Sequence, residues 1–201
     1  MDSQLTLVNL PPPLCLTFST NSMINVILYR DSQPAYIIST DLRIGGSTTE
    51  IRAADGTEVL ARVTRKELLP DTIAFPHING GEEMRLSKWL RRCKLSDNSD
   101  AHVIETEVGN CVLKKWHNAY RLALFAEYDL ETPVAHWERA NSISPLSLMF
   151  YSGTENFHPQ IIAAFTIMEL KMRREENAQA MRFSRFAARS TTLMSIGHGN
   201  M

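Results

Sequence analysis

The segment Ile161–Met172 constrains the fold of this chain more than any other stretch. Its residues are apolar on nearly every face of an α-helix for about three turns. Pro159 suits the first position of a helix, and Arg173-Arg174 would complement the helix dipole at the other end. We therefore expect a terminal helix over residues 159–174. Because such a helix must be buried on most faces, the rest of the chain has to enclose it.

The residues before this helix mostly follow the two-residue period of half-buried β-strands. Asp55-Gly56 separates two alternating runs, and this dipeptide favours a hairpin turn because both residues tolerate positive φ angles. Gly109-Asn110 is a second candidate for a two-residue turn. Counted in this way, the chain holds about twelve short strands, which is typical of a sandwich or a barrel. The apolar helix favours a mainly β fold in which an antiparallel closed barrel surrounds it.

The ends of the chain differ in composition from this core. Pro11-Pro12-Pro13 excludes a helix, so residues 1–13 are predicted to be an extended leader outside the fold. Residues 14–176 are predicted to form a single domain. Residues 177–201 turn polar and small, which predicts a flexible basic tail. A short basic amphipathic helix in this tail, lying on an anionic membrane or in a partner's groove, is the alternative.

The cysteine content and the charge bear on the compartment and on partners. Cys15, Cys93 and Cys111 are odd in number and widely spaced, unlike a zinc knuckle or a redox motif. The first residues lack the features of a signal peptide, and the longest apolar run is too short to span a bilayer. We expect an intracellular protein of the cytoplasm or the nucleus that is not transmembrane. The net charge of -1 gives no general attraction to nucleic acid, so no specific nucleic-acid binding is expected.

Several short motifs occur in an order and at spacings that resemble a known family. They are Tyr29, Pro34–Thr40, Lys115-Trp116, Pro133–Trp137 and the terminal helix with Arg173-Arg174. Through them, residues 14–176 resemble a mushroom-type fungal family known as domain of unknown function 6593. That family is similar to the tubby C-terminal and LURP-one-related folds. The resemblance implies a barrel of about twelve strands around a central hydrophobic helix. It implies no established activity, and no phosphoinositide-binding motif of tubby domains matches positions here.

A cluster of basic residues is the candidate binding surface. If Met84–Leu90 is a strand, Arg85, Trp89 and Arg91 share one face and form an exposed basic-aromatic patch. Such a patch suits phospholipid head groups or an acidic protein partner. The competing interpretation is a solvated edge strand on which positive charges discourage aggregation. The candidate ligand-binding residues are Arg85, Lys88, Arg91, Arg92, Lys114 and Lys115.

Catalytic and metal-binding patterns are weak in comparison. There is no G-x-S-x-G nucleophile motif and no phosphate-binding loop that carries a lysine. A Cys/His metal site would require Cys93, His102, Cys111 and His117 to converge, and the sequence does not decide whether they do. The alternative is that these are ordinary strand and turn residues. No catalytic residue, metal ligand or cofactor is therefore predicted.

These observations favour a non-enzymatic binding or scaffold domain of unknown ligand, which contacts phospholipid head groups or a protein partner. The alternative is a small-molecule-binding or enzymatic domain with its site at the mouth of the barrel. There, Cys111, His102 and His117 would be the first residues to inspect. A third hypothesis is a structural module that dimerises through an exposed strand edge. An enzyme is the less favoured class.

Overall fold

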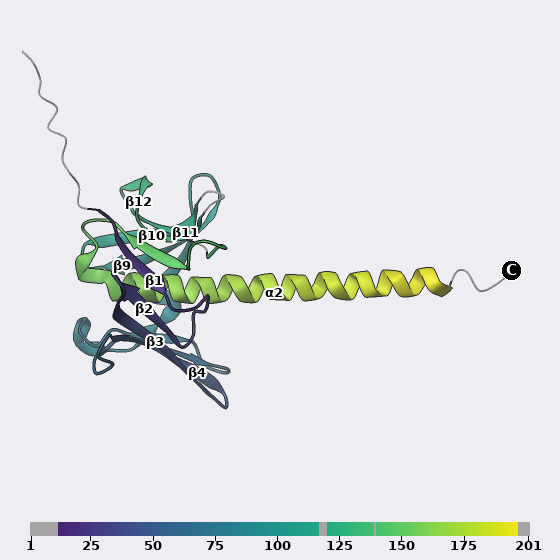
Figure 1. The fold of residues 1–201 in the computed structure, drawn as a ribbon, viewed down its shortest axis with the longest axis horizontal. Helices are drawn as coiled ribbons and strands as arrows, with labels where there is room; N and C mark the ends of the chain where they lie inside the picture. Colours follow the sequence, from purple (N-terminus) through teal and green to yellow (C-terminus); the bar gives the residue numbers. More distant parts are fainter. Residues whose placement is uncertain (1–11, 117–119, 139, 197–201) are drawn as a thin grey trace, which may run out of the picture. The chain divides into compact units, whose positions relative to one another are not determined.

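The computed structural model describes residues 12–116, 120–138 and 140–196. These residues form strands, two α-helices and two short 3-10 helices (Figure 1). In chain order the elements are β1 (Leu14–Phe18), β2 (Val26–Arg30), β3 (Gln33–Arg43), β4 (Gly46–Ala53), β5 (Val59–Lys66), β6 (Thr72–Ala74), η1 (Asn79–Gly81), β7 (Met84–Arg85), α1 (Leu86–Trp89), β8 (Leu90–Lys94), β9 (Asp100–Thr106), β10 (Gly109–Trp116), β11 (Tyr120–Ala126), β12 (Asp129–Glu138), β13 (Ser147–Phe150), η2 (Glu155–Phe157) and α2 (His158–Ile196).

All the strands belong to one antiparallel, 13-stranded sheet, which makes the fold mainly β as predicted. The strand order is β7-β6-β5-β4-β3-β2-β1-β13-β12-β11-β10-β9-β8. Two runs of consecutive hairpins meet where β1 pairs with β13, with Leu14 opposite Phe150. Every other neighbouring pair is consecutive in the chain, which is why local hairpin signals identified most strands.

The two predicted hairpin turns differ in outcome. At Asp55-Gly56 the turn is confirmed: Gly56 has a φ of 72°, and the Asp55 carboxylate accepts a hydrogen bond of 3.0 Å from the Thr57 amide. At the second site the predicted turn, Gly109-Asn110, is wrong by two residues. Residues 107 and 108 make the turn, and Gly109 opens β10 with a φ of 117°.

The predicted closed barrel is wrong, because the sheet is open. Among the described residues β7 pairs with β6 alone and β8 pairs with β9 alone, so the two ends of the sheet are not joined. The strand expected over Met84–Leu90 is interrupted after Arg85 by α1, a single helical turn. This turn buries the Trp89 ring against Phe75, with ring centroids 5.1 Å apart, while Lys88 stays exposed. A continuous strand would place Trp89 on the same face as Arg85 and Arg91, which are both exposed.

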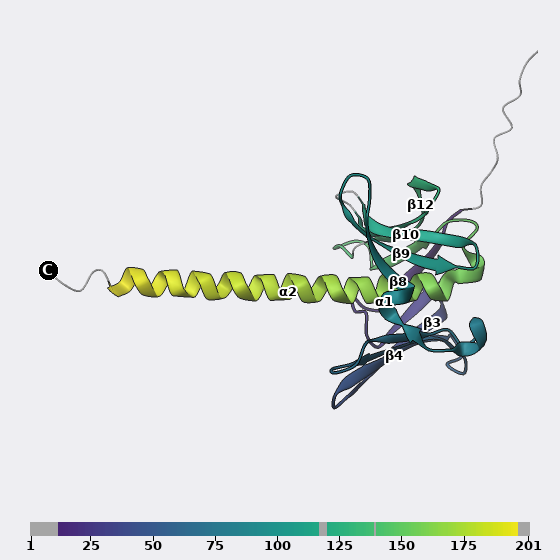
Figure 2. The same ribbon diagram turned by 180° about the vertical axis from the view of Figure 1, so that it is seen from behind.

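The first turns of α2 lie in the core, as the sequence predicted for this segment. Ile161, Ile162 and Phe165 have no exposed surface. Strands from both hairpin runs reach them: β12 through the stack of Trp137 on Phe165, and β3 through Tyr36, whose hydroxyl lies 3.4 Å from His158 Nδ1. Figures 1 and 2, seen from opposite sides, show strands on two sides of these first turns. The open sheet therefore curves around the start of α2.

By contacts the chain divides into two compact units, residues 1–165 and residues 166–201. In the second unit the helix α2 continues past Arg174, where the predicted terminal helix ends, as far as Ile196. The predicted leader lies outside the described residues except for positions 12 and 13, and so do the last residues of the predicted tail. No helix in the described part of the chain combines the length and the hydropathy needed to span a bilayer.

Candidate functional site

The structure does not gather the predicted basic residues on one surface. Arg92 of β8 lies opposite His102 of β9, and His102 lies opposite Leu113 of β10. Side chains of directly paired residues point to the same face of a sheet, and successive residues alternate between faces. Lys114, which follows Leu113, therefore points to the face opposite Arg92.

Two of the candidate residues, Arg92 and Lys114, already interact with other groups of the protein. Arg92 and Lys94 both contact the Asp100 carboxylate, at 3.0 and 3.1 Å. These two cations, Lys94 first, lower the pKa of Asp100 by hydrogen bonding. Lys114 donates a hydrogen bond of 3.0 Å to the Leu130 carbonyl oxygen, and its ammonium lies 4.5 Å from the centre of the Phe125 ring.

Arg85, Lys88 and Arg91 are exposed and have no hydrogen bond or ion pair with any described residue. Lys115 is exposed as well, on β10. Trp89, the aromatic member of the expected patch, is buried in the core and does not belong to this surface. What remains is a short row of cations along β7, α1 and β8.

The predicted cysteine and histidine residues do not converge. Cys93 is paired with Ala101, which precedes His102, so Cys93 and His102 point to opposite faces of the sheet. Cys111 is paired with Ile104, which lies two residues further along β9 than His102. His117 lies outside the described residues. Within the described ranges, no group of three or more His, Cys, Asp or Glu residues is placed to hold a metal ion.

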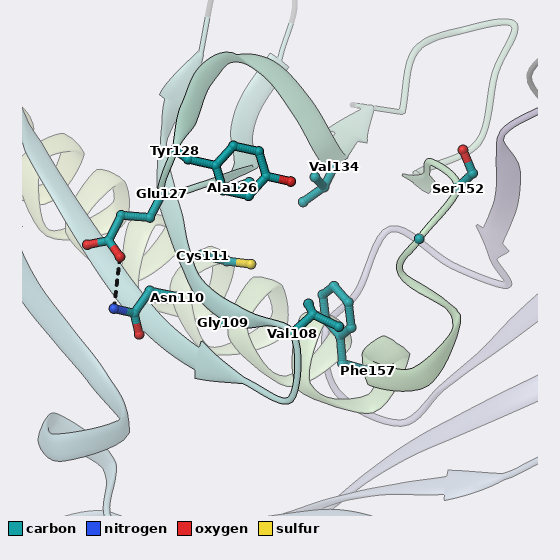
Figure 3. Close-up of a pocket in the computed structure, with 11 residues that line it drawn as sticks. Val108, Gly109, Asn110, Cys111, Ala126, Glu127, Tyr128, Val134, Ser152 and Phe157 are labelled. Carbon is teal, nitrogen blue, oxygen red and sulfur yellow. Dashed lines mark hydrogen bonds between the residues drawn. The ribbon is translucent and has the colours of Figure 1, made fainter.

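A cavity of about 470 Å³ lies where β10 begins and where β11 and β13 end, at positions that sequence reasoning had not combined. Its lining comes from the turn between β9 and β10, the end of β11, the middle of β12, and the loop from β13 to η2 (Figure 3). The residues that line it are Val108, Gly109, Asn110, Cys111, Ala126, Glu127, Tyr128, Val134, Ser152, Gly153 and Phe157.

Two of the residues that line this cavity are glycines with positive φ angles. Gly109 and Gly153 have φ angles of 117° and 92°, in the region that favours glycine over other residues. A Cβ atom built on either residue would meet no other atom within 4 Å. The backbone conformation therefore selects residues without side chains at two points of the cavity wall.

A fixed polar pair lies on one side of the cavity. Asn110 Nδ2 donates a hydrogen bond of 2.9 Å to Glu127 Oε2, joining the start of β10 to the turn between β11 and β12. Figure 3 shows the Cys111 thiol projecting between this pair and Val134. Burial raises the pKa of this thiol, a hydrogen bond with Thr106 lowers it, and the nearby Glu127 charge raises it, for a net increase. Cys111 is thus held as the neutral thiol, which is a poor nucleophile.

A family model matches residues 21–174, a range that contains every residue lining the cavity. The model is that of a family of unknown function, DUF6593. The chain belongs to the DUF6593 family. This confirms the family predicted from the sequence motifs. No curated protein and no solved structure matches the chain. The fungal origin and the likeness to tubby C-terminal and LURP-one-related folds stay predictions.

The charges around the cavity of this DUF6593 domain restrict what it can hold. Among its lining residues none is a lysine, an arginine or a histidine, and Glu127 is the single acidic one. The remaining wall is mainly apolar, with Val108, Val134 and Phe157 on it. A phosphate group would meet a carboxylate here and no cation to balance it. The geometry therefore suits a neutral or positively charged molecule with an apolar body.

Of these lining residues, sequence reasoning had singled out Gly109 and Asn110 as a turn, and Cys111 as a possible metal ligand. It missed the others because they come from segments far apart in the chain. The available signal was a pair of glycines, Gly109 directly after one turn and Gly153 within another.

Proposed function

We propose that this DUF6593 domain binds a small molecule, without catalysing a reaction on it, in the cavity between the β9–β10 turn and the β13–η2 loop. The observation that supports the proposal is the cavity itself, whose volume of about 470 Å³ lies in the range usual for small-molecule sites. Its mainly apolar wall and single fixed polar pair are the features by which such sites combine affinity with orientation.

The proposed ligand is neutral or positively charged, with an apolar body and at least one hydrogen-bond donor. The apolar body would pack on Val108, Val134 and Phe157. The donor would bond to the Glu127 carboxylate, which the Asn110 amide holds in place. A charge-assisted hydrogen bond of this kind fixes the ligand's orientation more strongly than a neutral one.

Binding to phospholipid head groups or to a protein partner has less support and stays a prediction. Arg85, Lys88 and Arg91 are the three exposed members of the predicted set on β7, α1 and β8 without a described partner. Each cation near an anionic surface contributes about 1 kcal/mol, so three give only weak attachment. The aromatic anchor that would strengthen it, Trp89, is buried.

Titration of the full chain with N-phenyl-1-naphthylamine, a neutral fluorescent amphiphile, tests the proposal. We expect a saturable rise in fluorescence that corresponds to one site. Val108→Trp, a substitution at an exposed turn position on the cavity wall, should weaken binding roughly ten-fold or more by filling the space. Ile143→Trp, on an exposed loop away from the cavity, is the matched control and should change nothing.

A second probe tests the charge preference. 1-Anilinonaphthalene-8-sulfonate has a similar ring system but carries a negative charge, so it should bind more weakly than the neutral probe. Glu127→Gln should reduce that difference, because it removes the carboxylate that repels the sulfonate.

Equal affinity of Val108→Trp and the unmodified chain for the neutral probe would show that this cavity is not the site.

We also propose that the protein works inside the cell, in the cytoplasm or the nucleus. Cys15, Cys93 and Cys111 are all free thiols. Free cysteines are usual in reducing compartments, whereas proteins of oxidising compartments more often carry disulfides. A fluorescent-protein fusion viewed in its native host would test the location.

A further inference from the structure

Four large apolar side chains lie on the surface where two loops of the sheet meet. One loop is the two-residue turn between β3 and β4, and the other joins β5 to β6. The four residues, here called the apolar tip, are Leu42, Ile44, Leu68 and Leu69. Each keeps at least 61% of its surface exposed, and Ile44 and Leu68 are essentially fully exposed. Figures 1 and 2 show the β3–β4 hairpin projecting beyond the strands beside it.

Backbone contacts hold the two loops against each other. The Glu67 amide donates a hydrogen bond of 3.1 Å to the Gly45 carbonyl oxygen, which joins one loop to the other. Gly46 lies opposite Lys66, and a Cβ atom on Gly46 would clash with the Arg65 carbonyl oxygen. The strands therefore approach closely at this point. The four side chains of the apolar tip are thus carried by one connected backbone surface.

The stability of the fold does not account for these residues. Turn positions such as that of Ile44 are usually taken by glycine or by a small polar residue. Apolar side chains stabilise a domain when they are buried, and those of the apolar tip are not. Single exposed apolar residues are ordinary, whereas a group of neighbouring ones marks an interaction surface. The apolar tip is therefore a candidate contact surface.

The charges around the apolar tip indicate which partner fits it. Residues 41–46 and 65–71 contain three acidic and three basic side chains, which are Asp41, Asp71, Glu67, Arg43, Arg65 and Lys66. An anionic membrane attracts surfaces that carry an excess of cations, and this rim has none. Two copies of a balanced rim do not repel each other. Across a two-fold axis, the acids of one copy can pair with the bases of the other.

We propose that the apolar tip is a self-association surface, through which two copies of this chain form a two-fold symmetric dimer. Ile44 and Leu68, its most exposed members, pack against the apolar tip of the second copy. Four side chains from each copy make a small interface, so the dimer is weak, with a dissociation constant between about 1 μM and 1 mM. None of the four residues lines the cavity of the proposed function, so neither proposal depends on the other.

Sedimentation equilibrium of the full chain measures this association. We expect the average mass to rise from that of one chain towards that of two as the concentration passes through this range. Ile44→Ser/Leu68→Ser changes only exposed positions, so the fold is retained, and it should weaken association roughly ten-fold or more. The matched control is Ile143→Ser, which is about as exposed but lies on another loop, and it should leave association unchanged.

A second control separates the apolar tip from the exposed part of α2. Met181→Ser/Phe183→Ser removes two exposed apolar side chains from that helix and should leave the dissociation constant unchanged. A dimer that is lost in this variant, but kept in Ile44→Ser/Leu68→Ser, would place the interface on the helix and contradict the proposal.

A cross-linking measurement tests the two-fold symmetry. Residues near a two-fold axis face their own counterparts in the second copy. Ile44→Cys should therefore form an intermolecular disulfide when diamide is added, and Ile143→Cys should form far less. Cys15, Cys93 and Cys111 are free thiols in both variants, so the unmodified chain treated with diamide gives the background.

Two further outcomes would overturn the proposal. The first is a single chain at every concentration up to about 1 mM. If that single chain binds neutral phosphatidylcholine vesicles, and Ile44→Ser/Leu68→Ser does not, a bilayer is the partner of the apolar tip instead. The second is a dissociation constant that is the same in Ile44→Ser/Leu68→Ser as in the unmodified chain, which would place the interface elsewhere.

Discussion

The indole of Trp137 stacks on the ring of Phe165, with ring centroids 5.9 Å apart and ring planes inclined by 10°. Both side chains are almost completely buried, and Phe18 of β1 packs edge-on against the same indole at 4.9 Å. This contact joins β12 and β1, close to where the two hairpin runs meet, to the first turns of α2. It therefore couples the central part of the open sheet to the helix that it surrounds.

Phe165→Ala should lower the free energy of unfolding by about 3–5 kcal/mol, because it removes a fully buried ring and leaves a cavity against Trp137. Phe183→Ala is the control, since Phe183 lies on the same helix with 77% of its surface exposed. That change should stay within about 0.5 kcal/mol. Chemical denaturation followed by tryptophan fluorescence measures both. Equal losses in the two variants would contradict the assigned role of the Trp137–Phe165 stack.

His158 should make the stability of the fold depend on pH. Its Nε2 lies 3.3 Å from Thr154 Oγ1, and the Thr154 hydroxyl donates its proton to the Tyr151 carbonyl oxygen. Nε2–H must therefore donate to Thr154, which leaves Nδ1 as the acceptor for the Tyr36 hydroxyl. Protonation of Nδ1 would break this arrangement. Burial, foremost, lowers the pKa of His158 below its ordinary value of 6.5.

A group whose pKa is lowered in the folded state binds more protons when unfolded, so stability rises with pH in that range. The contribution of His158 is complete above about pH 6.5 and is lost as the pH falls through the pKa of the folded state. Unfolding measured between neutral and mildly acidic pH should show this loss. His158→Gln should flatten part of the profile and leave the share due to His136, whose pKa burial also lowers. An unchanged profile in that variant would exclude His158 as a source.

Cys111 should react slowly with iodoacetamide near neutral pH. Its thiol is buried, and that burial raises its pKa, so little thiolate is present. Cys93, which is half-buried, should be alkylated faster. Peptide mass spectrometry distinguishes the two sites. Adding N-phenyl-1-naphthylamine, which should occupy the cavity, is expected to slow the alkylation of Cys111 further without affecting Cys93. Equal protection of both cysteines would point to a non-specific effect of the probe.

Anionic vesicles should bind this protein only at low ionic strength. Arg85, Lys88 and Arg91 supply about 1 kcal/mol each at a charged surface, and salt near 0.15 M screens exposed charges beyond about 8 Å. Co-sedimentation with phosphoinositide vesicles should be lost at that salt concentration, and also in Arg85→Glu/Lys88→Glu/Arg91→Glu. The control Lys66→Glu lies on β5, outside the predicted set. Binding that persists in physiological salt would favour the predicted lipid-binding function instead.

The strands and the buried helix could be predicted from the sequence because their signals are local. Alternation of apolar and polar residues shows which segments are strands, and Asp55-Gly56 shows where one hairpin turns. At Gly109 the same reasoning failed, because either Gly109-Asn110 or the residues before it can make a tight turn. Only the pairing of Gly109 with Thr106 in the sheet fixes which of them does.

The candidate sites depended on information that local patterns do not contain. Trp89 was expected on an exposed face, since the period of two appeared to continue through Met84–Leu90. The helical turn α1 reversed this by burying the indole against Phe75. Gly109 and Gly153 line one cavity although the chain between them includes three further strands. Such proximity follows from strand order and cannot be read from the spacing of the two glycines.

The sequence by itself determined that the chain is mainly β, that Ile161–Phe165 is buried, and that the chain belongs among DUF6593 proteins. The tertiary structure decided that the sheet stays open between β7 and β8, that the basic residues lie on different faces, and that a cavity adjoins the β9–β10 turn. The physical reason is the distance along the chain over which each effect operates. Hydrophobic periodicity acts between residues a few positions apart. Sheet closure and cavity formation instead depend on twist and register accumulated over many paired strands.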